Sequence, residues 1–294
     1  MKSLSRFTIF FVATIAFADQ PTPPTPAEQF AQLRREYRPA SYGLRDVKND
    51  LERKAAVERM GSFAPRFIEF AEEHPADPIV FEVLRQATQI VGSTDSGALT
   101  SWEISRSEFP SGSNEDCAGR IVSLLQRHHL RSDELAPVID RMRYGYRLEF
   151  AEFLEVVLKK NPHREIRGIA CISLALNLND RLQMLHLLES RADLEDCYQT
   201  VFGDRYVSDL KKLEKSNLPG RIENLFELAN KEFADVKLPY GTVGEIAESG
   251  LYELRNLGIG KTAPDIAGKD QSGIDIKLSG YRGKIVLLYF WSQY

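Results

Sequence analysis

The sequence predicts a mainly α-helical domain followed by the short start of an α/β domain. Between residues 28 and 235, apolar residues recur at helical spacing and strand patterns are sparse. After residue 258 the pattern changes to glycine-containing turns and a seven-residue apolar run, Ile285 to Trp291, which is typical of a strand buried on both faces. At 294 residues the chain is long enough for two domains.

The first 18 residues have the pattern of a secretory signal peptide. Lys2 and Arg6 form a basic start, and the apolar core that follows is too short to cross a bilayer comfortably. Ala16-Phe17-Ala18 is a cleavage site, so we expect a mature chain that begins at Asp19, is secreted or periplasmic, and has no integral membrane segment. An uncleaved anchor is the alternative. Residues 19–27 are rich in proline and predict an extended spacer.

Helix start signals recur through the predicted helical domain. Each places a capping side chain ahead of proline or acidic residues in the first turn. They open three predicted helices: 79–91 after Asp77-Pro78, 135–142 after Ser132-Asp133-Glu134, and 166–176 after Asn161-Pro162. An apolar stripe that includes Phe150 and Val157 predicts another helix before Asn161, with Arg147 on its polar face.

Two passages of the helical domain resemble each other. Phe67–Ala71 leads into Pro75, and Phe153–Val157 leads into Pro162. Each passage reads as a helix, a proline-containing turn and a second apolar helix, which suits stacked helix pairs of the HEAT or TPR kind. No strict period is present, so an irregular α-bundle remains the alternative. Residues 236–258 are expected to form a linker helix and a hinge.

The helical domain shows no pattern of a metal or catalytic site. Cys117, Cys171 and Cys197 lack Cys-x-x-Cys or zinc-site spacing. Cys171 lies in an apolar run and is expected to be buried, while a disulfide between Cys117 and Cys197 is left open. His128-His129 are expected at a helix end and His186 in half-buried packing. We expect no metal and no cofactor.

The segment from residue 259 to 294 carries four features in a fixed order. They are Ala263-Pro264-Asp265, a turn at Asp270–Gly273, the corner Leu278-Ser279-Gly280-Tyr281-Arg282-Gly283-Lys284, and the apolar strand that ends in Phe290-Trp291. Gly273 is free to take the positive φ that a hairpin turn needs. In this order the four features resemble the opening of a thioredoxin-like redoxin domain of the TlpA type, in the AhpC/TSA superfamily.

The resemblance implies a thiol–disulfide oxidoreductase whose reactive residue would follow Tyr294. In that family three residues separate Phe-Trp from the first cysteine of Cys-x-x-Cys. Here Ser292, Gln293 and Tyr294 follow, and the sequence stops. Because UGA encodes both a stop and selenocysteine, we expect a selenocysteine codon at this point, with a nonsense mutation or an incomplete sequence as alternatives. None of the residues present would then be catalytic. Phe290, Trp291 and Tyr294 would flank the site.

Two other functions remain open. One is a non-catalytic helical adaptor with a vestigial redoxin fragment, and the other is a peroxiredoxin-type peroxidase. The expected partners are a protein disulfide or a peroxide, and a protein that docks on the helical domain. The net charge of −4, with both signs interspersed, lacks the basic footprint of a nucleic-acid-binding protein.

The redoxin-like segment is also expected to be marginally folded. Without covering elements, the seven apolar residues forgo about 10–20 kcal/mol of burial energy, since each large side chain contributes about 1.5–3 kcal/mol. That exceeds the stability of a typical domain, about 5–15 kcal/mol. We therefore expect at most a marginal hairpin in residues 259–294, beside a helical domain that stays folded.

Overall fold

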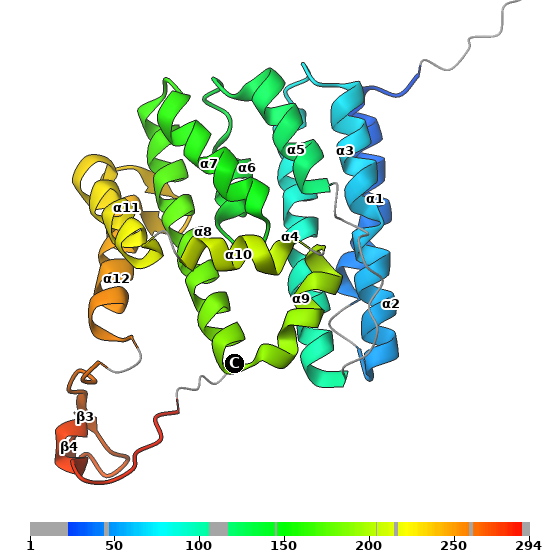
Figure 1. Ribbon diagram of the computed structural model, residues 1–294. Helices are drawn as coiled ribbons and strands as arrows, with labels where there is room; N and C mark the ends of the chain where they lie inside the picture. The colour runs from blue at the N-terminus through cyan, green and yellow to red at the C-terminus, as the bar shows by residue number, and fades with distance from the viewer. Residues whose placement is uncertain are drawn as a thin grey trace, which may run out of the picture.

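The computed structural model describes residues 23–43, 47–105, 117–144, 146–203, 205–214, 217–258 and 261–289, and these are mostly α-helical. Figure 1 shows the helices side by side, from α1 at the right to α12 at the left, with the strands β3 and β4 at the lower left. The expected mainly α class is confirmed. The predicted signal peptide, residues 1–18, lies outside the described residues.

The helical body is built from α-helices. They are α1 (Pro26–Tyr42), α2 (Asp50–Gly61), α3 (Phe63–Glu73), α4 (Val80–Ser105), α5 (Cys117–Leu124), α6 (Ala136–Ile139), α7 (Leu148–Lys160), α8 (Arg164–Ser190), α9 (Glu195–Phe202), α10 (Tyr206–Glu214), α11 (Leu218–Phe233) and α12 (Val243–Asn256). A π-helical turn (η1, Leu125–His129) follows α5, and 3₁₀ turns follow α6 (η2, Asp140–Arg143) and α8 (η3, Ala192–Leu194).

The predicted cap residues hold the starts of helices through their side chains. Asp77 accepts a hydrogen bond from the Ile79 N–H at 2.9 Å, just before α4. Asn161 accepts one from the His163 N–H at 2.8 Å, and its amide also donates to the carbonyls of Leu130 and Ser132. Asn161 therefore fixes the start of α8 and ties it to the loop after η1.

The core lies between helix pairs. The two predicted helix–turn–helix units are present as α3 with α4 and α7 with α8, and α11 packs against both α8 and α12. Three helices each contribute one fully buried phenylalanine: Phe67 of α3, Phe153 of α7 and Phe226 of α11. Burying each of these rings contributes about 1.5–3 kcal/mol. The pairs thus share one continuous apolar core.

Helix α12 is an integral part of this body. Val243, Ala247 and Leu251 are buried, and a Cβ on Gly250 would lie 2.5 Å from the ring of Phe226. Thr242 and Glu245 form a reciprocal capping box that fixes the start of the helix. The packing therefore continues past residue 235, into the segment that was expected to be a linker.

A small hairpin joins α11 to α12. Its strands are β1 (Lys237–Leu238) and β2 (Gly241–Thr242). At its tip the Tyr240 hydroxyl donates to Asp140 of η2 and accepts from Arg143. Burial and the hydrogen bond to Asp140 raise the pKa of Tyr240 to about 12, so this hydroxyl stays protonated and keeps the hairpin attached to η2.

The prediction for Arg147 is wrong. It was placed on the polar face of α7, but it precedes the helix and is only 4% exposed. Its guanidinium forms an ion pair with the Asp95 carboxylate on α4, and this pairing offsets the cost of burying the Arg147 charge.

Among the helices that the structure describes, we find none that combines the length and the apolar character needed to span a bilayer.

Candidate functional site

The segment that carries the resemblance begins with a hairpin. Strand β3 (Ala267–Lys269) pairs antiparallel with β4 (Asp275–Lys277). In the turn, the Asp270 carboxylate accepts hydrogen bonds from the N–H groups of Ser272 at 2.8 Å and Ile274 at 2.9 Å. Gly273 has a φ of +79°, which glycine adopts at little cost. The predicted hairpin turn is confirmed.

Two hydrogen bonds from Ser279 to the Asp265 side chain close the corner after the hairpin. The Asp265 carboxylate accepts from the Ser279 N–H at 2.8 Å and from the Ser279 hydroxyl at 2.9 Å. These bonds lower the pKa of Asp265, because they favour its ionised form. A 3₁₀ turn (η4, Leu278–Tyr281) follows, and Gly283 has a φ of +83° in the expected tight turn. Asp265 and Ser279, fourteen residues apart, therefore meet.

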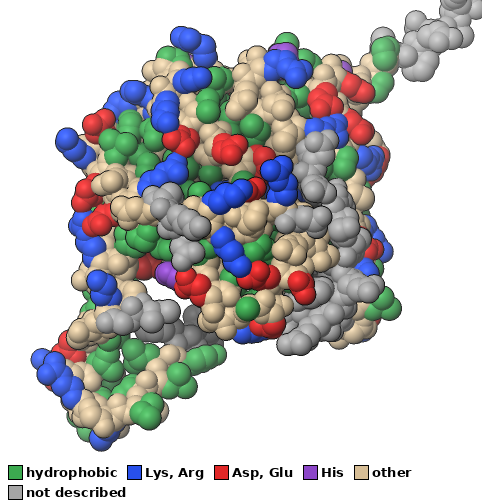
Figure 2. Space-filling model, in the orientation of Figure 1, with side chains coloured by type: hydrophobic (Ala, Val, Ile, Leu, Met, Phe, Trp, Pro, Cys, Tyr) green, Lys and Arg blue, Asp and Glu red, His purple; other side chains and the backbone are tan. Residues whose placement is uncertain are grey.

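The chain then enters an extended apolar run that is exposed. Ile285, Leu287 and Tyr289 are 105%, 90% and 80% exposed, while Val286 and Leu288 are half-exposed. This alternation is that of an extended strand, although residues 285–289 have no strand partner among the described residues. Hydrophobic side chains gather on the C-terminal segment at the lower left of Figure 2. The segment thus contains a hairpin, and none of residues 261–289 is buried; its marginal stability stays a prediction.

Three residues were expected to flank the reactive group. These residues, Phe290, Trp291 and Tyr294, lie outside the described residues. Pro264-Asp265 and Tyr281-Arg282-Gly283 are described, and they lie at the two ends of the Asp265–Ser279 corner.

The cysteines of the helical body are unsuited to thiol chemistry. Cys117, Cys171 and Cys197 form no disulfide, and each is at most 3% exposed. Burial raises the pKa of Cys171 to about 12, so this thiol is protonated at neutral pH and is not a nucleophile. The expectation that Cys171 is buried is confirmed, and the disulfide that was left open is not formed.

The histidines are dispersed. His128 and His129 end η1, as expected, and the His129 ring lies edge-on to Phe81 at 5.0 Å. Burial lowers the pKa of His129 and keeps it neutral. His186 is exposed, so the half-buried packing predicted for it is wrong. In the part of the chain that is described, no group of three or more metal-ligating side chains comes together.

Sequence reasoning missed the most buried charged group of the body. Arg147 donates to both carboxylate oxygens of Asp95 on α4, at 2.6 and 2.8 Å, and its guanidinium lies 5.0 Å from the ring centre of Phe202. Arg181 of α8 donates to the Arg147 carbonyl at 2.6 Å. The available signal was Asp95 itself, an acid four residues after the buried Val91 and five after the buried Ile90. The pair is enclosed by protein and joins α4 to the start of α7.

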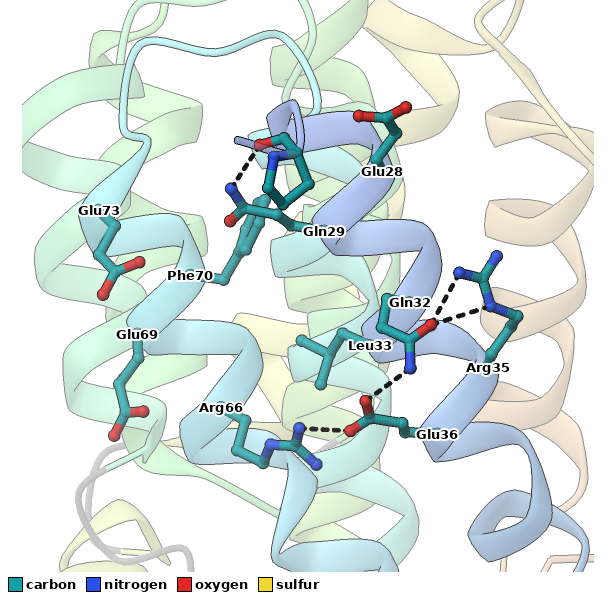
Figure 3. A pocket seen from close by; sticks show the side chains of 11 residues that line it. Glu28, Gln29, Gln32, Leu33, Arg35, Glu36, Arg66, Glu69, Phe70 and Glu73 are labelled. Carbon is teal, nitrogen blue, oxygen red and sulfur yellow. Dashed lines mark hydrogen bonds and ion pairs between the residues drawn. The ribbon is translucent and has the colours of Figure 1, made fainter. Parts of the chain in front are cut away.

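A hollow of about 670 Å³ lies between α1 and α3. Figure 3 shows that its polar side chains already bind one another: Arg66 pairs with Glu36 at 2.5 Å, and Gln32 bridges Glu36 and Arg35. Glu69 and Glu73 line the opposite wall. This hollow is an ordinary charged surface, and it brings no nucleophile or acid–base pair together.

Comparison with protein-family models, with curated proteins and with solved structures finds no match.

Proposed function

We propose that residues 261–294 are the first part of a thioredoxin-like domain, and that the protein in which this domain is whole is an exported thiol–disulfide oxidoreductase. The observation that carries this proposal is the exposed apolar run at 285–289, directly after the hairpin and the Asp265–Ser279 corner. Order and spacing resemble those of the redoxin motifs, and the hairpin, the corner and the extended run at 285–289 support the proposal.

Because residues 285–289 are exposed, we expect further structural elements to cover both faces of this run in the whole domain. Five consecutive apolar residues leave large side chains in water, at a cost of about 1.5–3 kcal/mol each. Strands with this composition are normally found in parallel sheets with helices on either side. A thioredoxin-like domain supplies such a sheet, with residues 285–291 as its central strand.

In this proposal the reactive group is a cysteine or selenocysteine placed just after the strand, at the start of a helix. The helix N-terminus lowers the pKa of such a group and stabilises the anion. The anion attacks one sulfur of a substrate disulfide, a mixed disulfide forms, and the other substrate sulfur leaves and takes up a proton. A resolving cysteine then attacks the mixed disulfide. The substrate ends with two thiols and the enzyme with a disulfide, or a selenenylsulfide.

The helical body supplies a rigid platform in this proposal. Its stacked hairpins share one core, and α12 delivers the chain to the redoxin segment directly from that core. We infer a HEAT- or TPR-like scaffold that holds the redoxin domain near a protein substrate.

The first test is to read the coding DNA beyond codon 294. We expect a UGA or cysteine codon, then a second cysteine three positions later and a thioredoxin-like continuation. The joined chain should reduce insulin disulfides with dithiothreitol as electron source, and a serine at the first reactive position should abolish this activity. Residues 1–294 alone should show only background reduction, because their cysteines are buried.

Other results would favour the other functions. A non-coding continuation supports the adaptor. A joined chain with a single reactive cysteine that consumes hydrogen peroxide but leaves insulin oxidised supports the peroxidase. Either result overturns the oxidoreductase proposal.

A further inference from the structure

A recess in the helical body lies between α4 and the chain segment that runs from η2 toward α7. It measures about 460 Å³, within the size range of small-molecule pockets. Small side chains on one face of α4 line it, and a Cβ added at Gly92 would meet no atom within 4 Å. Arg141 of η2, Tyr144 and Tyr146 line it from the other side. We refer to this hollow as the α4–η2 recess.

Thr88 of α4 brings an unpaired hydroxyl to the recess. It is 1% exposed, and its Oγ1 has no hydrogen-bond partner among the residues that the structure describes. A threonine in a helix can bond the carbonyl three or four residues earlier. Thr94 of the same helix does so, since its hydroxyl lies 2.9 Å from the carbonyls of Ile90 and Val91. Thr88 makes no such bond, and because a buried polar group without a partner is costly, its hydroxyl favours a bound polar group.

Arg141 brings a second unsatisfied group to the same recess. Its Nε–H is buried and has no acceptor in the described part of the chain. Arg141 lies near enough to Glu82 to help lower the pKa of that carboxyl, but both oxygens of Glu82 accept hydrogen bonds from Arg85, at 2.6 and 2.7 Å. Among the described residues that line the recess, Arg141 is the one that carries a charge. The recess is therefore suited to a ligand with one negative charge.

The two tyrosine rings are each held by a neighbouring side chain. The Tyr144 hydroxyl accepts a hydrogen bond from Arg143 at 3.0 Å, and the Arg143 guanidinium lies 5.0 Å from the centre of the Tyr144 ring. The Tyr146 ring stacks on Phe202, with the ring centres 6.1 Å apart. Because these contacts already restrict both rings, a flat ligand loses less affinity to the ordering of the pocket.

We propose that the α4–η2 recess binds a carboxylate that is attached to an aromatic ring. The Nε–H and one Nη–H of Arg141 can donate to the two oxygens of a single carboxylate, and the Thr88 hydroxyl can donate to the same group. The aromatic ring then packs against Tyr144 and Tyr146. A phosphate monoester carries nearly two negative charges at neutral pH, so one arginine neutralises it less completely.

Such a carboxylate has two sources. One is a free aromatic acid, and the other is the C-terminus of a protein chain that ends in an aromatic residue. Both present the same chemistry to the recess. The recess belongs to the helical body, so this binding is independent of the oxidoreductase proposal, and failure of either one leaves the other standing.

The test uses the 294-residue chain and two probes, benzoate and the acetylated peptide Gly-Gly-Phe with a free C-terminal carboxylate. Binding is measured by isothermal titration calorimetry. We expect saturable binding of at least one probe. Binding of benzoate indicates a free acid, and binding of the peptide alone indicates a protein C-terminus. Benzamide and the peptide amide, which lack the charge, should bind at least tenfold more weakly. If neither carboxylate probe binds, the recess holds only water and the proposal is wrong.

A matched pair of threonine variants tests the hydroxyl. Thr88→Val keeps the shape of the side chain and should weaken binding severalfold, because the ligand loses one hydrogen bond. Thr94→Val makes the same change at a hydroxyl that is already bonded within the helix, and it should leave the affinity unchanged. Equal affinities of these two variants would overturn the role assigned to Thr88 and with it the proposal.

Three further variants test the charge and the space. Arg141→Met should weaken binding at least tenfold, and Arg141→Lys should restore only part of the affinity, since lysine lacks the paired N–H groups. Arg131→Met removes an exposed arginine elsewhere and should have no effect. Gly92→Leu fills the recess and should prevent binding. Circular dichroism should show that each variant keeps the helical fold. Parent-like affinity in a folded Arg141→Met variant would also overturn the proposal.

Discussion

Replacing Arg147 with Met removes the cation that faces Asp95 inside the helical body. The two side chains are 5% and 3% exposed, and two hydrogen bonds of 2.6 and 2.8 Å join them. Removing one partner of such a buried pair leaves an uncompensated charge, which costs about 3–5 kcal/mol. We therefore expect Arg147→Met to lower the free energy of unfolding by about this amount, measured by urea denaturation followed by helical circular dichroism.

Two further variants make this measurement decisive. Arg66→Met breaks the pair with Glu36, whose members are 47% and 39% exposed, and should cost less than about 1 kcal/mol. Asp95→Leu combined with Arg147→Met removes both charges and should be more stable than Arg147→Met alone. If Arg147→Met costs no more than Arg66→Met, the assignment of Asp95 and Arg147 as a buried, mutually dependent pair is wrong.

Three other perturbations test other parts of the structure. In the native chain no cysteine should react quickly with Ellman's reagent, because all three thiols are buried and the pKa of Cys171 is raised to about 12; prompt reaction of any thiol without denaturant contradicts this packing. Gly250→Ala places a methyl group 2.5 Å from an aromatic ring of α11 and should cost about 1–3 kcal/mol in urea denaturation. By contrast, Gly92→Ala meets no atom within 4 Å and should be neutral or stabilising; equal effects of the two changes would refute the close packing of α12. Hydrogen bonding lowers the pKa of Asp265 below its usual 3.8, so its contribution to the corner is present above that pH and is lost as the pH falls through the lowered value. Amide exchange at Ser279, followed by NMR, should speed up only in that acidic range, and an Asp265→Asn variant should lack the transition.

The helical part of the fold was largely predictable, because its signals are local. The capping residues Asp77 and Asn161 and the apolar stripe around Phe153 act within one or two turns of their own helices. They predicted the pairs α3–α4 and α7–α8. The length of α8 was underestimated, since its buried polar residues, such as Asn177 and Arg181, interrupt the apolar pattern.

The pairing of distant residues was not predictable in the same way. Asp95 and Arg147 are 52 positions apart, and the sequence around either residue does not predict that the two will pair. In the segment from residue 261 the turn residues predicted the hairpin and the tight turn, because Asp270, Gly273 and Gly283 act on backbone within four residues of themselves.

The ion pair between Asp95 and Arg147 also bears on how the chain unfolds. Arrays of stacked helix pairs normally melt from their ends, because each unit touches only its neighbours. Here one charge contact, closed off from water, ties the middle of α4 to the start of α7, and α8 contacts α7, α10, α11 and α12. Losing one hairpin would expose a lone charge in another, so partial melting is penalised. The body is expected to unfold in a single cooperative transition instead of unravelling stepwise.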